Sequence, residues 1–585
     1  MVSQKNEVRS GFPSIDKPWN KYYTEEALTG KVPEDTMYRY LLESNKEHMS
    51  DTALIYFGRK IPYTEFFENI RRLANSFAAI GVKKGDIVTI FSSNTPETVY
   101  AIFALNYIGA LPSLEYVTAS GPEAVAAVER SKSSVVLILD VLMSQFEGLS
   151  GCDMVKTIIS LPLGASMPLH MRTLVAAKNM FKKRLPKEIS YADFVRKGSK
   201  TQAVEAPFEK GTPAVIVHSS GTTGVPKGVL LSNESLVYIA WAFLHNSPDA
   251  HCCDIYMAYI PLFHAFGLGM GLLAPLSQSM QVVLSPKFDE TSLLNNFKKY
   301  KPNHIMASGA HIPALMADPV INKMDLSFFR TCGYGGSPLT EAQERDLVSF
   351  LGAHNSIAKA SAGYGMSELS SAVCCERNSF YGKVGSVGLP LCRANVKVLD
   401  IDTGKEIGYN CSGELCFSTP GLMLEYLNNE KETANAFFYD DEGVRWIHTG
   451  DLGFVDEDGF VFITGRIKRL YSTRSSKGGT MFKIFPDYVG SVIDEVDSVY
   501  ESAVVCIEDP DYRYIAIAFA VLKPDATEAE TRERITEHMA EKLPAHCIPK
   551  ALFFRDSLPL TGIGKVDFNL LEEEAKAKVQ QLTIA

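Results

Sequence analysis

No stretch of the 585-residue sequence stays apolar for the ~18 residues that a membrane-spanning helix requires. Residues 1–17 are polar and contain no apolar core of a secretory signal. The 11 cysteines are too few for a disulfide framework, and they show no repeated C-x2-C spacing of a zinc site. We therefore expect a cytoplasmic protein whose cysteines are reduced and pack as small apolar side chains.

The sequence also lacks an excess of positive charge. Its formal net charge is −10 at pH 7, which disfavours nucleic acid and acidic membrane surfaces as general partners. A composition of 46% hydrophobic and 22% charged residues is typical of a soluble globular protein. The length alone predicts roughly three or four domain-sized units.

Residues 161–192 depart from this acidic background. Basic side chains stand there among apolar ones, and the pattern predicts a basic amphipathic helix. The basic residues are Arg172, Lys178, Lys182, Lys183, Arg184 and Lys187. We favour a solvated helix on an insertion, and peripheral contact with a membrane surface is the alternative.

The first half of the chain alternates between predicted strands and helices. Residues 54–57 and 61–63 predict a hairpin, and Thr64 is the predicted N-cap of a helix that ends near Gly81. A further helix is expected over residues 94–110. The other predicted strands are 86–91, 133–140, 214–218, 281–284 and 304–307. This spacing predicts βαβ units and a parallel sheet.

After about residue 400 the pattern becomes rich in strands and turns. The predicted strands of this part are 395–399, 413–417 and 459–463. Beyond Arg466 the apolar runs predict a separate small domain. The expected fold class is α/β, with a large N-terminal domain of βαβ layers plus a β-rich subdomain (residues 1–467) and a small α+β C-terminal domain (residues 468–585).

Hydroxyl-bearing residues and glycines are concentrated in Ser219–Gly228, directly after a predicted strand. Glycines let backbone N–H groups converge on one centre, and hydroxyls add donors, so this loop suits phosphate oxygens. The candidate phosphate-binding residues are Ser219, Ser220, Gly221, Thr222, Thr223, Gly224 and Lys227. A Walker A motif is excluded, because Val225 and Pro226 separate the last glycine from the lysine. A flexible surface loop is the alternative.

The segment 219–229 (SSGTTGVPKGV) resembles the signature loop of the adenylate-forming superfamily of acyl-CoA synthetases, firefly luciferases and peptide-synthetase adenylation domains. Further segments are similar to motifs of this family and follow the family's order. They are Gly363–Glu368 (GYGMSE, with Ser367 in place of threonine), Thr449-Gly450-Asp451, Gly465-Arg466-x-Lys468 and Gly562-Ile563-Gly564-Lys565. Within the family the chain is most similar to long- and medium-chain fatty acyl-CoA synthetases.

The resemblance implies a nucleotide site for ATP and AMP. Tyr364 would stack on adenine with residues 335–338 on the other face of the base, and Asp451 would accept the ribose hydroxyls. Glu368 would hold Mg²⁺, which binds one or two carboxylates together with substrate phosphates. The implied nucleotide contacts outside the loop are Gly335, Gly336, Ser337, Pro338, Gly363, Tyr364, Gly365, Met366, Asp451, Arg466 and Lys468.

The resemblance also implies the reaction. A carboxylic acid attacks the α-phosphorus of ATP, pyrophosphate leaves, and the acyl group of the resulting adenylate passes to coenzyme A. Such catalysis relies on positioning and charge neutralisation. Residues 1–467 would form the adenylation domain, and residues 468–585 a mobile domain that rotates at Lys468. The implied catalytic residues are Lys565, Glu368, Ser367 and His264.

The acid is indicated by residues 261–267 (PLFHAFG), which contain no carboxylate to pair with the ammonium of an amino acid. This form is similar to that of fatty and aryl acyl-CoA ligases and luciferases, and it places His264, Phe266 and Gly267 in the substrate pocket. The glycines at 267, 269 and 271 indicate either an elongated tunnel or tight helix packing. We favour a fatty acid, and an aromatic acid stays open.

The sequence departs from the family pattern in the region implied to bind the acceptor thiol. Met481 stands where the family usually has a glycine that shapes the thiol channel, and residues 474–479 form an apparent short insertion. Coenzyme A is the acceptor that the resemblance implies. Because of this departure, the phosphopantetheine of an acyl carrier protein is the alternative. A nucleotide-binding protein without catalysis is the alternative of another class, and the intact Lys565 and Glu368 argue against it.

Overall fold

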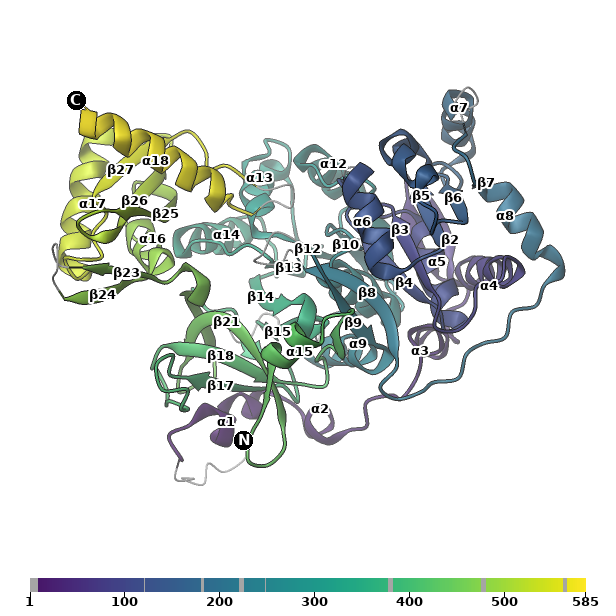
Figure 1. Cartoon of the computed structure of the whole chain (residues 1–585), viewed down its shortest axis with the longest axis horizontal. Coiled ribbons are helices and arrows are strands. Elements are labelled where there is room, and N and C mark those ends of the chain that lie inside the picture. Colours follow the sequence, from purple (N-terminus) through teal and green to yellow (C-terminus); the bar gives the residue numbers. More distant parts are fainter. Residues whose placement is uncertain are drawn as a thin grey trace.

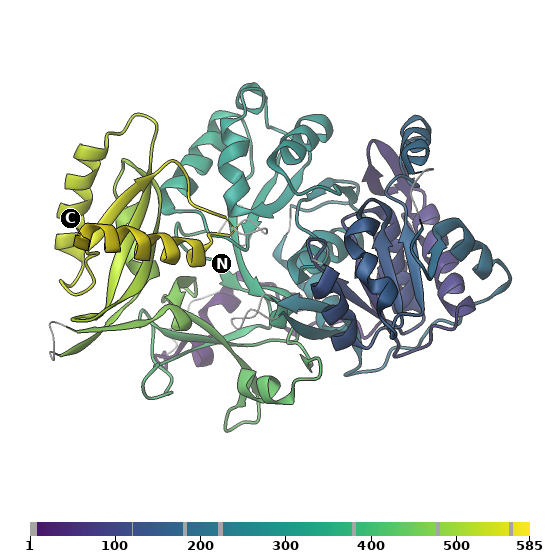
Figure 2. The same ribbon diagram turned by 45° about the horizontal axis from the view of Figure 1, so that its top comes forward.

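The computed structural model describes residues 9–119, 121–179, 184–219, 226–247, 249–376, 382–474, 480–560 and 565–584. Two large sheets form most of the N-terminal part, and smaller sheets follow (Figure 1). Figure 2 shows the C-terminal elements at one end of the molecule and the strands β3 to β7 at the other. The predicted α/β class, with a large parallel-sheet part and a smaller C-terminal part, is confirmed.

The first large sheet has eight strands and is parallel at its centre. In spatial order its strands are β19 (Glu425–Tyr426), β9 (Lys227–Ser232), β8 (Pro213–Ser219), β4 (Leu111–Glu115), β3 (Ile87–Phe91), β5 (Val135–Leu139), β6 (Thr157–Leu161) and β7 (Glu188–Ser190). Helices α5 (Pro96–Tyr107), α6 (Gly121–Ser131), α7 (Leu169–Asn179) and α8 (Tyr191–Lys197) belong to this region of the chain. The antiparallel hairpin of β8 and β9 lies near one edge of the sheet.

The second large sheet has nine strands, parallel from β1 to β14 and antiparallel at both edges. In spatial order they are β16 (Leu389–Pro390), β15 (Ser371–Cys375), β14 (Ala360–Met366), β13 (Thr331–Gly335), β12 (His304–Ser308), β10 (Ile255–Ala258), β11 (Gln281–Leu284), β1 (Thr52–Tyr56) and β2 (Arg59–Pro62). Helices α9 (Asn233–Asn246), α10 (Ala265–Leu268), α11 (Ala274–Ser277), α12 (Glu290–Tyr300), α13 (Ile312–Ala317) and α14 (Glu341–Ala353) accompany it.

A single hydrophobic cluster joins the two large sheets. It contains Val88 of the first sheet and Val282 of the second, together with Tyr100 of α5 and Ile239 of α9, each at most 1% exposed. Helices α5 and α9 are buried on nearly every face. Because burial of each such side chain contributes about 1.5–3 kcal/mol, this shared core holds the two sheets as one body.

Most predicted elements of the first half exist, with shifted ends. The hairpin β1–β2 and the strand β11 are confirmed, and α4 (Tyr63–Ala79) stops just before Gly81, whose φ is +88°. The predicted N-cap is wrong. Pro62 is the N-cap, and the hydroxyl of Thr64 donates to the backbone oxygen of Met49 instead.

The basic segment 161–192 is not one helix. Its first residue ends β6, its middle forms α7, and β7 and the start of α8 follow. Lys182 and Lys183 lie outside the described residues. Leu169 and Leu174 of α7 are 76% and 66% exposed. Among the described residues, no helix is both long and apolar enough to cross a membrane.

The expectation for the cysteines holds for most of them and is wrong for three. Seven are buried, as small apolar side chains would be: Cys332, Cys374, Cys375, Cys392, Cys416, Cys506 and Cys547. Cys252, Cys253 and Cys411 are exposed. Packing in the hydrophobic core therefore does not explain why cysteines occupy positions 252 and 253.

A β-rich subdomain and a C-terminal part complete the fold. The subdomain contains β17 (Asn395–Leu399), β18 (Gly413–Ser418), β20 (Phe437–Tyr439), β21 (Arg445–Val455) and β22 (Val461–Arg466), with α15 (Glu430–Ala436) beside them. The C-terminal part contains β23 (Tyr471–Arg474), β24 (Met481–Ile484), β25 (Val499–Asp509), β26 (Arg513–Leu522), β27 (Ala551–Arg555), α16 (Pro486–Asp494), α17 (Glu528–Lys542) and α18 (Phe568–Ile584). Two hydrophobic clusters are confined to this C-terminal part.

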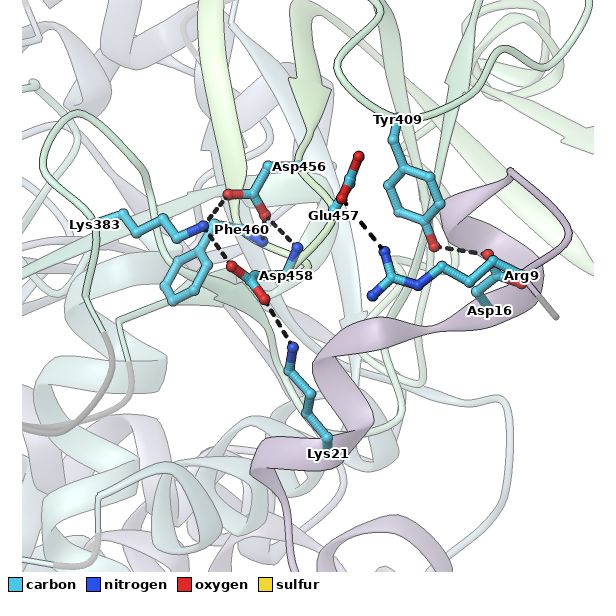
Figure 3. Close-up of polar contacts among 9 residues, drawn as sticks. All are labelled: Arg9, Asp16, Lys21, Lys383, Tyr409, Asp456, Glu457, Asp458 and Phe460. Carbon is cyan, nitrogen blue, oxygen red and sulfur yellow. Dashed lines mark hydrogen bonds and ion pairs between the residues drawn. The ribbon is translucent and has the colours of Figure 1, made fainter. Parts of the chain in front are cut away.

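The N-terminal segment reaches back to the β-rich subdomain. It consists of α1 (Pro13–Asp16), a 3₁₀ turn, α2 (Glu25–Thr29) and α3 (Met37–Ser44). Lys21 pairs with Asp458 in the turn between β21 and β22, and the hydroxyl of Tyr409 donates to Asp16 (Figure 3). Lys383 pairs with both Asp456 and Asp458 in the same turn. These contacts fix the end of the β21–β22 hairpin that lies away from Asp451.

Candidate active site

A cavity of about 1040 Å³ opens where the two large sheets, the β-rich subdomain and residues 565–569 meet. It brings together residues that are far apart in the sequence. The predicted residues that line it are Ser219, Lys227, His264, Phe266, Gly335, Gly336, Gly363, Tyr364, Gly365, Met366, Ser367, Glu368, Asp451, Arg466, Lys468 and Lys565. The predicted loop residues 220–224 lie outside the described residues.

Three predicted residues take part in packing and are not part of the cavity wall. The hydroxyl of Ser337 contacts that of Ser308 at 2.6 Å and accepts a hydrogen bond from the backbone of Ala310, so Ser337 and the adjoining Pro338 fix a turn. A Cβ on Gly267 would lie 2.1 Å from the backbone oxygen of Pro261, so this glycine permits close chain packing.

The predicted phosphate loop connects two antiparallel strands. Ser219 at the end of β8 and Lys227 at the start of β9 are cross-strand partners. The Lys227 ammonium forms an ion pair with Glu432 and lies 4.9 Å from the centre of the Tyr426 ring. Its side chain is only 17% exposed, so a cation is held at the cavity wall with little access to water.

Two glycine-rich segments meet on neighbouring strands. Gly335, the last residue of β13, and Gly363 of β14 form the last registered pair of these two parallel strands. Ligands bind at the carboxyl ends of the strands in open α/β sheets. Gly336 has a φ of +78°, which favours glycine. A Cβ on Gly365 would lie 1.8 Å from the backbone oxygen of Ser371, so only glycine fits there.

Asp451 is the centre of a buried polar network. The Tyr364 hydroxyl donates to one of its oxygens at 2.6 Å, and Arg466 Nε lies 2.9 Å from the other. Strands β21 and β22 make Asp451 and Arg466 cross-strand partners. Burial raises the pKa of Asp451, and the charge of Arg466 opposes that rise. The carboxylate is thus held in one orientation and presented to the cavity.

Glu368 is a second buried carboxylate of the cavity, only 6% exposed. Burial raises its pKa, while a hydrogen bond of 2.7 Å from the Tyr426 hydroxyl and the charge of Lys227 lower it. The 3₁₀ turn Ser367–Leu369 directs the side chain, and Met423 N–H donates to the Glu368 backbone oxygen at 2.8 Å. A carboxylate in this position can hold a divalent cation beside phosphate oxygens.

Lys565 lines the same cavity, although the three residues before it in the chain lie outside the described residues. Its side chain keeps exposed surface, yet the cavity walls shield it from bulk water. This desolvation, together with the positive charge of Arg466, lowers the pKa of Lys565, and Asp451 opposes the change. A lysine and two buried carboxylates therefore face one space.

One part of the cavity is apolar. Its aromatic rings contact each other edge-on, Tyr116 with Phe263 at 5.2 Å and Tyr259 with the imidazole of His311 at 5.5 Å between ring centroids. Phe288 and Met306 complete this wall. Such a wall suits the apolar tail of a small molecule whose polar group points the other way.

His264 lies at the border between the apolar and polar parts, with its ring 5.6 Å from that of Tyr116. Burial, with a smaller contribution from the charge of Lys565, lowers the pKa of His264 to about 4. The imidazole is therefore neutral at pH 7 and can line a pocket for an uncharged tail.

Of the two structures that the glycines at 269 and 271 indicate, tight packing is found. A Cβ on Gly269 would lie 2.9 Å from the Ser371 side chain, and one on Gly271 would contact Ala258 at 3.8 Å. Both glycines are fully surrounded by protein. The buried residues of the segment 265–277 thus pack against the core.

Sequence reasoning missed several polar residues of the cavity. Tyr426 and Glu432 contact Glu368 and Lys227, and Glu414 accepts a hydrogen bond from Gly450 N–H at 3.0 Å. Tyr426 lies on β19, a strand of two residues that pairs with β9. Two residues are too few to show a periodic pattern, so neither the strand β19 nor the contact of Tyr426 with Glu368 could be predicted from the sequence.

The whole arrangement can be compared with known proteins. The AMP-binding enzyme family matches residues 41–427, which is more than half of the chain, and the AMP-binding enzyme C-terminal domain matches residues 488–565. The chain belongs to the AMP-binding enzyme family. The resemblance to the adenylate-forming superfamily is thus confirmed.

Curated relatives of this AMP-binding enzyme cover nearly its full length. A 4-coumarate–CoA ligase of Humulus lupulus is 28% identical over 521 residues, covering 87% of this chain and 88% of the relative. A long-chain-fatty-acid–CoA ligase of Bacillus subtilis is 26% identical, covering 96% and 98%.

Solved structures show that the fold is shared. The crystal structure of an anthranilate CoA ligase with anthranoyl-AMP has a TM-score of 0.79 at 22% identity, covering 94% of this chain and 99% of that one. A benzoate CoA ligase from Burkholderia xenovorans has a TM-score of 0.76 at 20% identity, covering 92% and 99%.

Proposed function

We propose that this AMP-binding enzyme is an AMP-forming acid–CoA ligase that activates a carboxylic acid with an apolar tail. The observation that carries the proposal is that Lys565, Glu368 and Asp451 line one cavity, another part of whose wall is apolar. Carboxylate activation needs a cation between two anionic reactants and fixed acceptors for the nucleotide. All three groups come from different parts of the chain and converge on one space.

The polar part of the cavity fits ATP. The buried Asp451 oxygens are suited to accept ribose hydroxyls, and Arg466 beside them can donate to ribose or phosphate oxygens. Tyr364 and the strand end at Gly335 and Gly336 would flank the base. Lys227, at the start of β9, would contact the terminal phosphates once its ion pair with Glu432 opens.

Glu368 fits a Mg²⁺ site, because its buried carboxylate accepts one hydrogen bond from Tyr426 and lines the phosphate side of the cavity. When bound, the ion would supply positive charge to the phosphates of ATP. Ser367 precedes Glu368 in the 3₁₀ turn and would position it.

In the first step a substrate carboxylate oxygen attacks the α-phosphorus, the bond to the β-phosphate breaks, and pyrophosphate leaves. Lys565 would hold the carboxylate and the α-phosphate together and offset their negative charge. In the second step the sulfur of coenzyme A attacks the acyl carbon, AMP leaves with the electron pair of its bond, and the thiol proton passes to solvent. We propose that residues 468–585 move as a unit about Lys468 between the steps.

The tail of the acid has two candidates. The edge-on aromatic rings of Tyr259, Phe263 and Phe288 favour a compact aromatic acid, because offset and edge-to-face ring contacts are favourable. The long-chain-fatty-acid–CoA ligase relative and the apolar character of the same wall support a fatty acid. The packed glycines 269 and 271 weigh against a long channel.

A substrate panel tests the proposal. Pyrophosphate and thioester are measured together for aromatic and fatty acids, with and without coenzyme A. Lys565→Ala should reduce acid-dependent pyrophosphate release by about 100- to 1,000-fold, the usual cost of removing one group that stabilises a transition state. Lys550→Ala, which removes a lysine over the Tyr512 ring elsewhere in the C-terminal part, should leave it unchanged. Equal rates in the two variants would reject the proposed role of Lys565.

The panel also separates the alternatives for the acceptor. Adenylate formed without any coenzyme A thioester would reject the CoA ligase and favour transfer to a carrier protein. Met481, 43% exposed on β24, does not line the cavity in this conformation. A substitution of Met481 should therefore change the rate of the thioester step alone.

A further inference from the structure

Two exposed loops bring four metal-binding side chains together, away from the catalytic cavity. One loop lies between α3 and β1 and carries His48 and Asp51, and the other precedes β10 and carries Cys252 and Cys253. The loops are about 200 positions apart in the sequence, since His48 and Cys252 differ by 204. None of the four residues lines the catalytic cavity.

The donor atoms of these residues form a compact group. His48 Nδ1 lies 2.8 Å from Asp51 Oδ2 and 3.3 Å from Cys252 Sγ, and all three atoms lie within 4.8 Å of one another. Cys253 Sγ adds a fourth donor, 3.2 Å from Cys252 Sγ and 3.6 Å from Asp51 Oδ2. A tetrahedral Zn²⁺ site with bonds of about 2.0–2.3 Å has ligand-to-ligand edges of about 3.3–3.8 Å. Two of the observed spacings, 2.8 and 3.2 Å, are shorter than these edges, and the other two, 3.3 and 3.6 Å, fall within their range, so outward rotations of the side chains would admit the ion.

Both loops are held in place by hydrogen bonds to their backbones. Asp51 N–H donates to the His48 oxygen at 2.9 Å, which puts both side chains on the same side of a turn. Cys253 N–H donates to the Ser279 oxygen at 3.0 Å, and the Gln281 amide donates to the Cys253 oxygen at 2.7 Å. The group is therefore largely preorganised for a ligand.

The backbone at Cys253 has an uncommon conformation, with a φ of +66°. A non-glycine residue rarely adopts a positive φ, and such strain is often found at functional positions. Consecutive residues usually point their side chains apart, as along a strand. Here both thiols, of Cys252 and Cys253, lie against Asp51 and His48.

The charges of the group favour a cation. Among the described residues, Asp51 makes an ion pair with His48 and with no lysine or arginine. Cysteine and histidine are preferred ligands of Zn²⁺, and an aspartate is a common additional one. Mixed sulfur and nitrogen donors disfavour Mg²⁺ and Ca²⁺, which bind oxygen.

We propose that His48, Asp51, Cys252 and Cys253 form a structural Zn²⁺ site that clips the loop before β1 to the loop before β10. The site is separate from the proposed ligase chemistry. Its ion would connect two loops at the β10–β11–β1 side of the nine-stranded sheet, and a ligand that binds only the folded state stabilises that state.

The test uses the full-length chain, reduced and freed of metal. Co²⁺ is added first, because four-coordinate cobalt with thiolate ligands gives intense visible bands and a near-ultraviolet charge-transfer band. Zn²⁺ is then added as competitor. We expect one equivalent of Co²⁺ with the thiolate band, full displacement by Zn²⁺, and a higher thermal unfolding temperature with Zn²⁺ than without it.

Two variants and one control decide the outcome. Cys252→Ser with Cys253→Ser should abolish the thiolate band. His48→Ala should weaken Zn²⁺ binding by ~100-fold or more, because loss of a residue that only supports a ligand already weakens metal binding by about 10- to 100-fold. Cys411→Ser removes an exposed cysteine of the β-rich subdomain and should change neither. The group of Glu414, Cys416 and His448, of which Glu414 and His448 line the cavity, stays intact in every variant, so it does not affect the comparison.

Failure of the zinc site and failure of the ligase are distinguishable. The double cysteine variant should keep the acid-dependent pyrophosphate release of the wild type, because its residues lie outside the catalytic cavity. Equal Zn²⁺ stoichiometry and affinity in the wild type and the double variant would overturn the proposal. So would a wild type that binds no Co²⁺ in the reduced state.

Discussion

Arg466 Nε lies 2.9 Å from Asp451 Oδ1, and the two residues face each other across strands β21 and β22. This contact places two of the family-like motifs on one hairpin. The strand that carries Arg466 continues into the 3₁₀ turn at residues 467–469, which leads to the C-terminal part. The proposed nucleotide contact, Arg466, and the proposed hinge, Lys468, are thus two positions apart in the sequence.

The first prediction concerns Asp451. Asp451→Asn removes the charge that Arg466 and the proposed ribose hydroxyls share. Because hydrogen bonds to charged groups contribute about 1.5–3 kcal/mol, we expect kcat/KM for ATP to fall about 10- to 150-fold. Initial rates of pyrophosphate release at varied ATP concentrations measure this change. Asp456→Asn, at the far turn of the same hairpin, should leave kcat/KM for ATP unchanged, and an equal loss in both variants would contradict the assignment.

The second prediction concerns the hydroxyl of Tyr426. Tyr426→Phe keeps the ring beside Lys227 but removes the donor to the buried Glu368. The hydrogen bond lowers the pKa of Glu368, so its loss raises that pKa further above the ordinary value. The acid limb of the pH–rate profile should therefore lie at a higher pH in Tyr426→Phe than in the wild type.

A pH–rate profile of kcat/KM for wild type and Tyr426→Phe checks this shift. Tyr439→Phe, which changes an exposed tyrosine of β20, is the matched control. An acid limb at the same pH in wild type and Tyr426→Phe would show that the contact with Glu368 does not affect catalysis.

The third prediction concerns stability and His264. Its pKa is about 4 in the folded chain and about 6.5 when unfolded. Above pH 6.5 protonation of His264 does not affect the free energy of unfolding. As the pH falls towards 4, the unfolded state binds a proton at this imidazole and the folded state does not, so the free energy of unfolding decreases. His264→Phe removes this loss, so the variant should gain up to about 3 kcal/mol relative to wild type across that range.

Urea unfolding at several pH values between 4 and 7 measures the difference. His170→Phe, on the exposed face of α7, should follow the wild-type pH dependence. A difference between His264→Phe and wild type that does not change with pH would contradict the buried, neutral imidazole.

The fourth prediction compares two glycines. Gly365→Ala places a Cβ 1.8 Å from the backbone oxygen of Ser371, whereas Gly352→Ala on α14 meets nothing within 4 Å. Because backbone must shift in the first case, we expect a loss of about 3 kcal/mol or more in unfolding free energy. Gly352→Ala should be neutral or add up to about 1 kcal/mol, since alanine favours a helix. Equal unfolding midpoints in denaturant would contradict the close approach.

The sequence indicates those parts of the candidate site that are local in the chain. The hydroxyl- and glycine-rich loop, the turn that carries Glu368 and the hairpin that carries Asp451 each have their chemistry within a few consecutive residues. Strands with a clear local pattern, such as the apolar run of β11 and the alternating residues of β17, are also predicted at their observed bounds. Their signal is the residue pattern itself, which needs no knowledge of tertiary partners.

What the sequence could not show depends on contacts between distant segments. The bond from Tyr426 to Glu368 arises because the two-residue strand β19 joins the edge of the first sheet. The sequence predicts Thr64 as the N-cap of α4, but Pro62, with an extended backbone, is the N-cap. The Thr64 hydroxyl donates to the backbone oxygen of Met49. Glycines 269 and 271 indicated two structures equally well, and only packing partners decide between them.

The ion pair between Lys21 and Asp458 joins residues 437 positions apart. A ribosome that adds about 5–20 residues per second needs roughly 20–90 seconds to produce the second partner after the first. Throughout that interval the segment around Lys21 has no β21–β22 turn to bind. The β-rich subdomain and the start of the chain can therefore associate only late in synthesis, after the strands of both large sheets have left the ribosome.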